Sequence, residues 1–237
     1  MTTPATPALA AWSAPADGGG PAGRQQERSE LSTRRLLDAC ASLIVERGYE
    51  RTTLADIGKR AGYSQGLVTR RFGSKANLLA ALVERMSDRF GPERITDTAA
   101  GRSGAAAVSH IVREIREDAR RSPDGLRAFY ALLFEGTRPV PESHERLRAI
   151  NRSFRRDLAG FFSDGLAAGT VKPGTDPVVL ANLVASSLRG IAYFWLLDPD
   201  EFDIVAELDH LADFVDTALA PPDDAEDFRR TSREGEV

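Results

Sequence analysis

The chain has 237 residues, 42% of them hydrophobic and 28% charged, and is long enough to bury a sizeable core in one or two globular domains. Its one cysteine, Cys40, excludes an internal disulfide and fits a reducing cytoplasm. The N-terminus lacks a basic region followed by a long apolar run, so we predict no signal peptide.

The net charge of −4 is divided unevenly along the chain. Residues 24–85 carry 12 Lys and Arg against 7 Asp and Glu, a net charge of +5, and the rest of the chain carries −9. Basic charge is therefore concentrated in one segment, which favours a contact with phosphate there and argues against one by the acidic remainder.

Residues 1–30 are rich in Ala, Pro, Gly and Thr, as in the run from Gly18 to Pro21. Such a segment buries too little apolar surface to offset its ordering entropy, so we predict a disordered arm. A first helix is then expected from Ser32 to Arg47, with Ser32 as its N-cap and Gly48 as its stop. Cys40 lies in the apolar stripe of this helix, and we interpret it as a small buried residue rather than a redox sensor.

Two short helices joined by a tight turn are predicted next. Leu54, Ile57 and Ala61 recur at helical spacing after Thr52 and Thr53, and Thr is a good N-cap. Gly62 ends this helix, because glycine takes the left-handed conformation without steric cost. Ser64 is the N-cap of a second helix from Gln65 to Phe72, which Gly73 ends. Ser74 then caps a third helix that opens with Lys75.

The second short helix has a distinctive outer face. Val68 and Phe72 face inward, which leaves Gln65, Gly66, Thr69, Arg70 and Arg71 on the other side. Gln, Thr and Arg side chains pair with base edges or phosphates, and glycine lets the backbone come close. Residues 61–75 contain no carboxylate, which phosphate would repel. The segment is therefore interpreted as a DNA-reading helix, with a solvated helix as the alternative.

The rest of the chain is predicted to be helical. The helix that opens at Ser74 should continue to about Phe90, where Gly91 and Pro92 end or bend it, and residues 96–104 should form a loop. Five further helices and a disordered tail are expected at residues 104–121, 125–135, 143–168, 176–197, 201–219 and 221–237.

The last two of these helices look like a dimerisation pair, in which two helices from each protomer make a four-helix interface. The alternative is that they complete the core of a monomer. Residues 178–197 are apolar but contain Asn182, two serines and Arg189, so we interpret them as a buried helix rather than a membrane span. The five arginines between 146 and 156 are interpreted as a solvated helix face rather than a second nucleic-acid surface.

The segment from Thr33 to Val83 resembles the DNA-binding domain of the tetracycline-repressor (TetR) family of bacterial transcription regulators. The resemblance rests on residues in register with the family pattern, which are Leu36–Ala39, Gly48, Tyr49, Thr52, Thr53, Ile57, Ala61, Gly62, Ser64, Gly66, Phe72, Ser74, Lys75 and Leu78. Thr69 and Arg71 depart from it, since the family usually has an aromatic residue at the first position and His or Tyr at the second. The operator sequence therefore cannot be carried over.

The resemblance implies an all-α fold with a three-helix helix-turn-helix DNA-binding domain at residues 31–85 and a helical ligand-binding and dimerisation domain at residues 86–220. It implies contacts to double-stranded DNA through Thr53, Gln65, Gly66, Thr69, Arg70 and Arg71, with Thr52, Ser64 and Lys75 holding the backbone. Arg24 and Arg28 either reach DNA, as such arms do in relatives, or belong to a solvated tail.

In the family, the later helices enclose a small-molecule effector whose binding releases DNA. In this chain, aromatic side chains are spread over three of these helices. They either belong to the hydrophobic core or line such a pocket, in which case we expect an apolar or aromatic effector. The expected pocket residues are Phe129, Tyr130, Phe134, Phe154, Phe161, Arg189 and Trp195. His110, His144 and Asn151 are further polar candidates for orienting a ligand.

No enzyme, cofactor or metal site is predicted. The sequence shows no Gly-rich phosphate loop and no metal-ligand cluster, and its three histidines are widely spaced. We therefore expect a cytoplasmic, homodimeric regulator of transcription, most simply a repressor of a palindromic operator released by an effector. The alternative is a helical scaffold that binds a protein partner and not DNA.

Overall fold

The computed structural model describes residues 21–135 and 141–220, and over those residues the chain is helical with no strand. The chain divides into two compact units, residues 1–35 and 36–237. The predicted all-α class is confirmed. The predicted domain limits at residues 30, 85 and 220 stay predictions, and the predicted tail at 221–237 lies outside the described residues.

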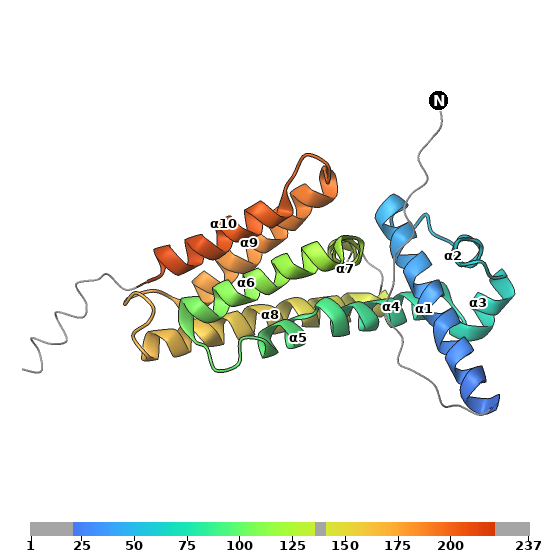
Figure 1. The fold of residues 1–237 in the computed structure, drawn as a ribbon, viewed down its shortest axis with the longest axis horizontal. Helices are drawn as coiled ribbons and strands as arrows, with labels where there is room; N and C mark the ends of the chain where they lie inside the picture. The colour runs from blue at the N-terminus through green and yellow to red at the C-terminus, as the bar shows by residue number, and fades with distance from the viewer. Residues whose placement is uncertain (1–20, 136–140, 221–237) are drawn as a thin grey trace, which may run out of the picture. The chain divides into compact units, whose positions relative to one another are not determined.

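Ten helices occur in the described residues (Figure 1). Their bounds are α1 Pro21–Arg47, α2 Leu54–Ala61, α3 Gln65–Phe72, α4 Lys75–Phe90, α5 Pro92–Asp97, α6 Gly104–Arg121, α7 Pro123–Glu135, α8 Pro141–Ala167, α9 Pro177–Leu197 and α10 Ile204–Ala218. The bounds predicted for α3, α4 and α6 are therefore confirmed, and those of α2, α8 and α9 are met to within a few residues.

Helix α1 begins at Pro21 and not at Ser32, so the prediction of disorder is wrong for residues 21–30. Ser32 does not act as a cap, because its hydroxyl donates to the carbonyl of Ser29, 2.8 Å away, inside the helix. Residues 1–20 of the predicted arm lie outside the described part of the chain. The composition of residues 21–30 alone gave no apolar stripe from which this helix could be recognised.

Three other boundaries differ from the prediction. Helix α5 occupies residues that were expected to lie partly in a loop, because Pro92 at the first helical position starts a new helix directly after Gly91. Helix α7 begins at Pro123 for the same reason, before the expected residue 125. Helix α10 begins only at Ile204, where the Asp203 carboxylate accepts hydrogen bonds from the backbone of Val205 and Ala206.

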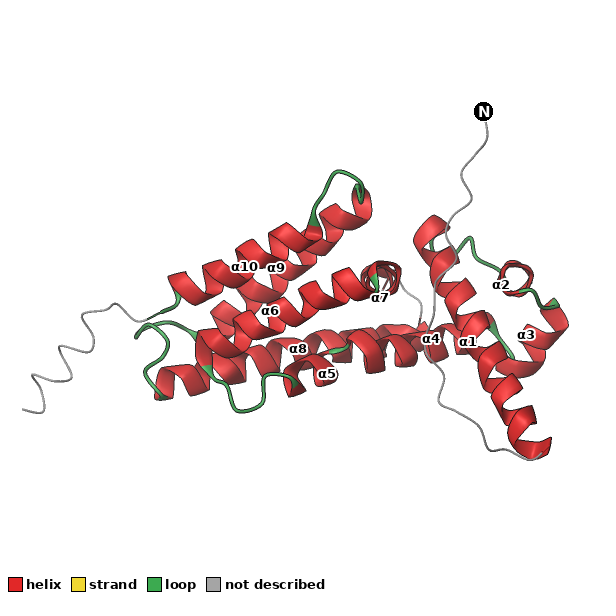
Figure 2. Cartoon of the chain, in the orientation of Figure 1, coloured by secondary structure: helices red, strands yellow, loops and turns green. Residues whose placement is uncertain are grey.

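The helices after α5 share one hydrophobic core. Helix α6 packs against α10 and α8, and α8 packs against α9, as the helical ribbons of Figure 2 show. Val108, Ile111 and Val112 of α6 have no exposed surface. Ion pairs flank this contact on the solvent side, since Arg113 lies 2.8 Å from Asp216 and Arg116 lies 2.5 Å from Asp209. Because these pairs are only partly buried and remain open to solvent, the apolar contact supplies most of the packing free energy.

Helix α9 is buried on one face only. Leu180, Val184 and Leu188 pack into the core, whereas Leu183 and Phe194 are 59% and 55% exposed. It is the one helix in the described residues that is long and apolar enough to span a membrane by length and composition, and 39% of its most apolar window is buried. The prediction of a buried helix therefore holds for one face.

Two glycines let the start of α6 approach the end of α8. Gly104 has φ +61°, which favours glycine, and a Cβ built on Gly165 would lie 2.3 Å from the Cα of Gly104. No side chain fits between the two backbones there. By contrast, a Cβ built on Gly160, earlier in α8, would have no atom within 4 Å.

We expect Gly165→Ala to lower the free energy of unfolding by about 1–3 kcal/mol, because its Cβ meets backbone that cannot move aside. Gly160→Ala is the matched control in the same helix and should stabilise by about 0.5–1 kcal/mol, since alanine favours a helix interior. Urea unfolding followed by circular dichroism measures both. Equal stabilities of the two variants would contradict this account of the α6–α8 contact.

Candidate nucleic-acid interface and effector cavity

Capping hydrogen bonds define the ends of the two short helices. The Thr53 hydroxyl accepts from the backbone N–H of Asp56 at 3.2 Å, and the Asp56 carboxylate accepts from the backbone N–H of Thr53 at 3.1 Å. Gly62 takes φ +79° after α2, and the Ser64 hydroxyl accepts from the backbone N–H of Leu67 at the start of α3. The predicted caps Thr53 and Ser64 and the predicted glycine stops are confirmed.

A glycine that the sequence analysis did not single out determines how closely α2 and α3 pack. Gly58 is buried, and a Cβ there would lie 2.9 Å from the carbonyl oxygen of Tyr63 and 3.2 Å from Cγ2 of Val68. Val68 has no exposed surface and holds α3 against this site. Because the turn and α3 pack closely against Gly58, the outer face of α3 has a fixed direction relative to α2.

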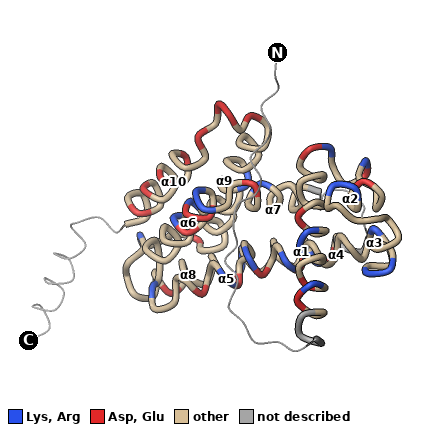
Figure 3. Tube along the Cα trace, turned by 45° about the vertical axis from the view of Figure 1, so that its right-hand side comes forward, with Lys and Arg blue, Asp and Glu red and all other residues tan. Residues whose placement is uncertain are grey.

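The outer face of α3 presents most of the predicted DNA-contacting residues. Ser64, Gln65, Gly66, Thr69 and Arg70 are exposed. Figure 3 shows basic and no acidic residues along α3. No ion pair of Arg70 is found within the described residues. Together these residues form an acid-free polar surface about two helical turns long.

Three predicted residues lie differently. Thr52 is 1% exposed, and its hydroxyl donates to the carbonyl of Gly48 at 2.9 Å, so the expectation that this hydroxyl holds phosphate is not supported. Arg71 is half-buried. Lys75 is also half-buried, with Nζ 3.2 Å from the carbonyl of Glu50 and 4.0 Å above the ring of Tyr49. Lys75 therefore ties the start of α4 to the segment after α1.

Ion pairs lie beside this surface rather than on it. Arg60 makes a bidentate contact with Glu46, with both N–O distances 2.7 Å, and Arg47 lies 2.8 Å from Asp56. These pairs join α2 to α1. They neutralise the carboxylates of Glu46 and Asp56, so these two acids oppose an anion at α3 less than unpaired acids would.

A small cavity lies among the helices of the C-terminal region. Its volume is about 20 Å³, which is room for about one water molecule. Of the seven predicted pocket residues it brings together four, which are Phe129, Tyr130, Phe154 and Arg189. The sequence analysis missed six more lining residues, which are Phe90, Pro92, Ile95, Ile115, Leu126 and Ile150.

The other three predicted pocket residues lie elsewhere. Phe134 packs edge-on against Tyr193, with ring centroids 6.2 Å apart. Trp195 is buried under Arg127, whose guanidinium carbon lies 5.8 Å from the indole ring centroid. Phe161 packs against the general core. Helical spacing alone could not separate these residues from the cavity, because each aromatic fits a core position equally well.

Arg189 is the charged residue among those that line the cavity. Its Nη2 donates to Oδ1 of Asn151 at 3.1 Å, and its guanidinium carbon lies 5.6 Å from the ring centroids of both Tyr130 and Phe154. Burial lowers the pKa of Arg189, and burial also raises the pKa of the Tyr130 hydroxyl. Asn151, a predicted polar candidate, thus acts on the cavity through Arg189.

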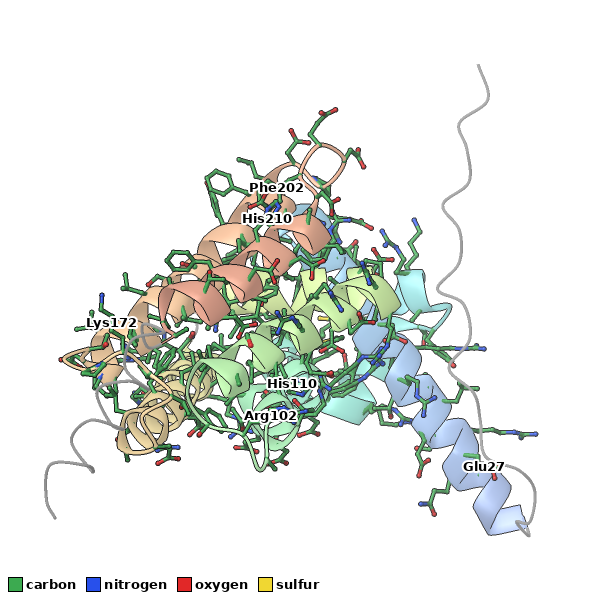
Figure 4. All side chains as sticks on the ribbon, turned by 60° about the vertical axis from the view of Figure 1, so that its left-hand side comes forward. Glu27, Arg102, His110, Lys172, Phe202 and His210 are labelled. Atoms are coloured by element: carbon green, nitrogen blue, oxygen red, sulfur yellow. The ribbon has the colours of Figure 1, made fainter. Side chains whose placement is uncertain are left out.

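Two further polar candidates are not at the cavity, and the cysteine is buried. His110, on α6, and His144, on α8, do not line it, and Figure 4 shows His110 well apart from His210. No group of three potential metal ligands occurs in the described residues. Cys40 is buried, and burial raises the pKa of its thiol to about 12, which confirms the interpretation as a packed residue.

Known proteins match most of this chain. Residues 36–82 match the family model of bacterial regulatory proteins of the tetR family, and residues 104–220 match that of the BetI-type transcriptional repressor C-terminal region. The HTH-type transcriptional regulator BetI of Burkholderia thailandensis is 26% identical over 194 residues, which span 81% of this chain and 95% of that protein.

Solved structures share the fold. NalD of Pseudomonas aeruginosa, the secondary repressor of the MexAB-OprM efflux pump, has a TM-score of 0.66 at 23% identity and covers 82% of this chain and 98% of its own. FadR of Bacillus subtilis in complex with stearoyl-CoA has a TM-score of 0.63 at 19% identity. The match covers 78% of this chain and 98% of the FadR chain. The names of BetI, NalD and FadR describe all three as regulators or repressors.

The capping box of α2 predicts a pH-dependent stability. Hydrogen bonds from Thr53, and then the charge of Arg47, hold the pKa of Asp56 below its ordinary value of 3.8. A carboxylate with a depressed pKa stabilises fully above the unfolded-state value and loses that effect as pH falls through the folded value. We therefore expect Asp56→Asn to lower Tm at pH 7, and the difference from wild type to shrink below about pH 3.8.

Thermal unfolding followed by circular dichroism across this range measures the effect. Asp200→Asn is the control, because it removes an exposed carboxylate from the loop after α9, so a change common to both variants reflects net charge alone. A Tm difference for Asp56→Asn that persists unchanged at low pH would mean that ionised Asp56 does not stabilise α2.

Proposed function

Because this chain belongs to the TetR family of bacterial transcription regulators, we propose that it is a cytoplasmic, homodimeric repressor that reads a palindromic operator with α3 and leaves it when a small molecule enters the cavity. The observation that carries the proposal is the exposed, acid-free face of α3 within a matching helix-turn-helix unit. Gln65, Thr69 and Arg70 are the proposed base readers. Ser64, Gly66 and the N-terminus of α3 approach phosphate.

Positions that are less exposed have supporting roles in this proposal. Thr53 holds the start of α2, where the exposed helix N-terminus meets the DNA backbone. Arg71 and Lys75, both half-buried, supply positive charge behind the reading face rather than direct base contacts. Thr52 keeps the turn before α2 closed through its bond to Gly48.

An exposed apolar stripe supports the homodimer. Leu183, Phe194 and Leu197 of α9 recur on one face, and Phe214 of α10 is also exposed, at 63%. Large exposed apolar patches mark interaction sites, and a second copy of this stripe would cover it in a four-helix interface. A two-fold dimer also doubles the bases that α3 reads, which a single short helix needs for useful specificity.

The cavity supports regulation by a ligand. It is too small for anything larger than about one water, so a ligand must displace lining side chains to enter. Phe90 at the end of α4 is one of them, and α4 starts at Lys75, directly after the turn that ends α3. A shift of α4 is therefore the proposed route by which ligand entry changes the presentation of α3. FadR, a relative in fold, takes an apolar-tailed ligand, stearoyl-CoA.

Selection of bound sequences from random duplex DNA at moderate salt tests the proposal. Enrichment of a palindrome with two half-sites is the expected result, because a two-fold dimer imposes its symmetry on the site. Weak, salt-sensitive binding without sequence preference would contradict specific reading by α3. No binding at low salt would favour the scaffold alternative.

Arg70→Ala should weaken binding to the selected duplex by about tenfold or more, because one lost base or phosphate contact costs about 1–3 kcal/mol. Fluorescence anisotropy over a range of salt concentrations measures the affinity. Arg120→Ala is the control, since Arg120 is an exposed arginine on α6, far along the chain from α3. Wild-type affinity in a folded Arg70→Ala protein would remove Arg70 from the reading surface.

Leu183→Glu should convert the protein from a dimer to a monomer of 25.7 kDa, because it places a charge in the apolar stripe. Light scattering coupled to size exclusion gives the mass. Ser163→Glu, an exposed position on α8, should leave the dimer intact. A monomeric wild type at micromolar concentration would contradict the proposed interface.

A further inference from the structure

Arg189 is an unusual residue for a cavity of this kind. Its guanidinium contacts only neutral groups in the described residues, namely the amide oxygen of Asn151 and the ring faces of Tyr130 and Phe154. None of the described residues that line the cavity carries a carboxylate. Arg189 is half-buried, and a charge that is partly removed from water without an opposite charge beside it destabilises the folded chain, so some gain must offset it.

The surroundings of Arg189 restrict what that gain can be. The two rings hold the guanidinium by cation–π contacts, and Asn151 fixes one edge, since its own Nδ2 donates to the carbonyl of Leu147 at 3.1 Å. A guanidinium held in this way offers planar paired donors that match a carboxylate or a phosphate. A cationic ligand would be repelled, and a neutral one would leave the charge uncompensated.

The remaining lining defines the other end of the ligand. Apart from Arg189 and the Tyr130 hydroxyl it is apolar, with Phe90, Ile115, Leu126, Phe129, Ile150 and Phe154 on several sides. Only an apolar body can replace the contacts that these side chains make with one another when the cavity opens. The cavity is therefore matched to a molecule with one charged end and one apolar end.

An open outer hollow adjoins the cavity. Pro92 and Ile150 line both the cavity and an open outer hollow of about 300 Å³, so these two side chains separate the two spaces. Three arginines line the outer hollow, and each is ion-paired, Arg146 with Glu84, Arg152 with Glu145 and Arg156 with Asp157. Asp88 and Glu93 also line it, so the outer hollow itself does not select an anion, and the charge that would do so is that of Arg189 inside the cavity.

We propose that the effector of this protein is an amphipathic anion, whose carboxylate or phosphate pairs with Arg189 and whose apolar chain or ring fills the space between α4, α6, α7 and α8. The inference rests on the proposed effector cavity and specifies the chemical class of its ligand. Ligand entry compensates the charge of Arg189 and opens the packed side chains around it in the same event.

Isothermal titration of the DNA-free protein tests the inference. The probes are straight-chain and aryl carboxylates of graded length, each beside its uncharged amide, its trimethylammonium analogue and its coenzyme A thioester. We expect at least one free acid or its thioester to bind about tenfold or more tightly than the matched amide, because hydrogen bonds to a charged partner are about twice as strong as neutral ones. Comparison of each free acid with its thioester shows whether the bound anion is a carboxylate or the phosphate of coenzyme A.

Two variants localise the effect. Arg189→Gln should reduce the affinity for the anion to that for the amide, while the amide affinity stays as in wild type. Arg127→Gln is the matched control, because it removes a half-buried arginine that lies over Trp195 and does not line the cavity. If Arg189→Gln fails to fold, the ratio of anion to amide affinity in the wild type alone still decides between the classes.

Equal or tighter binding of the amide or the trimethylammonium analogue would overturn the inference, and so would failure of every anion to bind. An Arg189→Gln protein that keeps the preference for the anion would also overturn it. Release of the selected duplex by uncharged compounds alone would leave the proposed repressor intact and remove this ligand class. Binding of an anion without release of DNA would support this ligand class and contradict the proposed release of the operator by a ligand.

Discussion

The close approach of α2 and α3 at Gly58 determines which side chains α3 presents. A Cβ at this position would lie 2.9 Å from the carbonyl of Tyr63, so only glycine allows the turn to fold over α2. With Val68 buried against the same site, helical periodicity directs Gln65, Thr69 and Arg70 outward. The direction of the outer face of α3 is thus a consequence of one missing methyl group and one buried valine, and the caps at Thr53 and Ser64 fix the helix ends around them.

Two other features lower the stability of a single chain. The exposed apolar stripe of α9 remains in water, and the Arg189 charge sits among aromatic rings. Proteins tend to break the usual rules of burial at functional sites and to offset the loss elsewhere. In the proposed account a second copy covers the stripe and an anionic ligand compensates Arg189, so both departures have a function. The tightly packed contact of α6 with α8 and α10 stabilises the fold. This stabilisation offsets the cost of the exposed stripe and of the Arg189 charge.

Local signals in the sequence predicted the fold well and the cavity only in part. Glycine stops and Ser or Thr caps act within a few residues, which is why the limits of α3 and the start of α4 could be predicted. The N-terminal part of α1 has no apolar stripe, and α5 starts at a proline that reads equally well as a helix stop. Phe134, Phe161 and Trp195 fit the same periodicity as Phe129 and Phe154, so only the packing of separate helices distinguishes them. The burial of Thr52 depends likewise on the path of the chain after Gly48.

The central claim is that two copies of α3 read one duplex, and hydroxyl-radical footprinting on the selected sequence tests it most directly. The account predicts two protected segments on one face of the DNA, separated by about one helical turn, roughly 10 base pairs. Both should weaken together in the Arg70→Ala protein. A single protected segment, or uniform protection that fades with salt and ignores sequence, would contradict it.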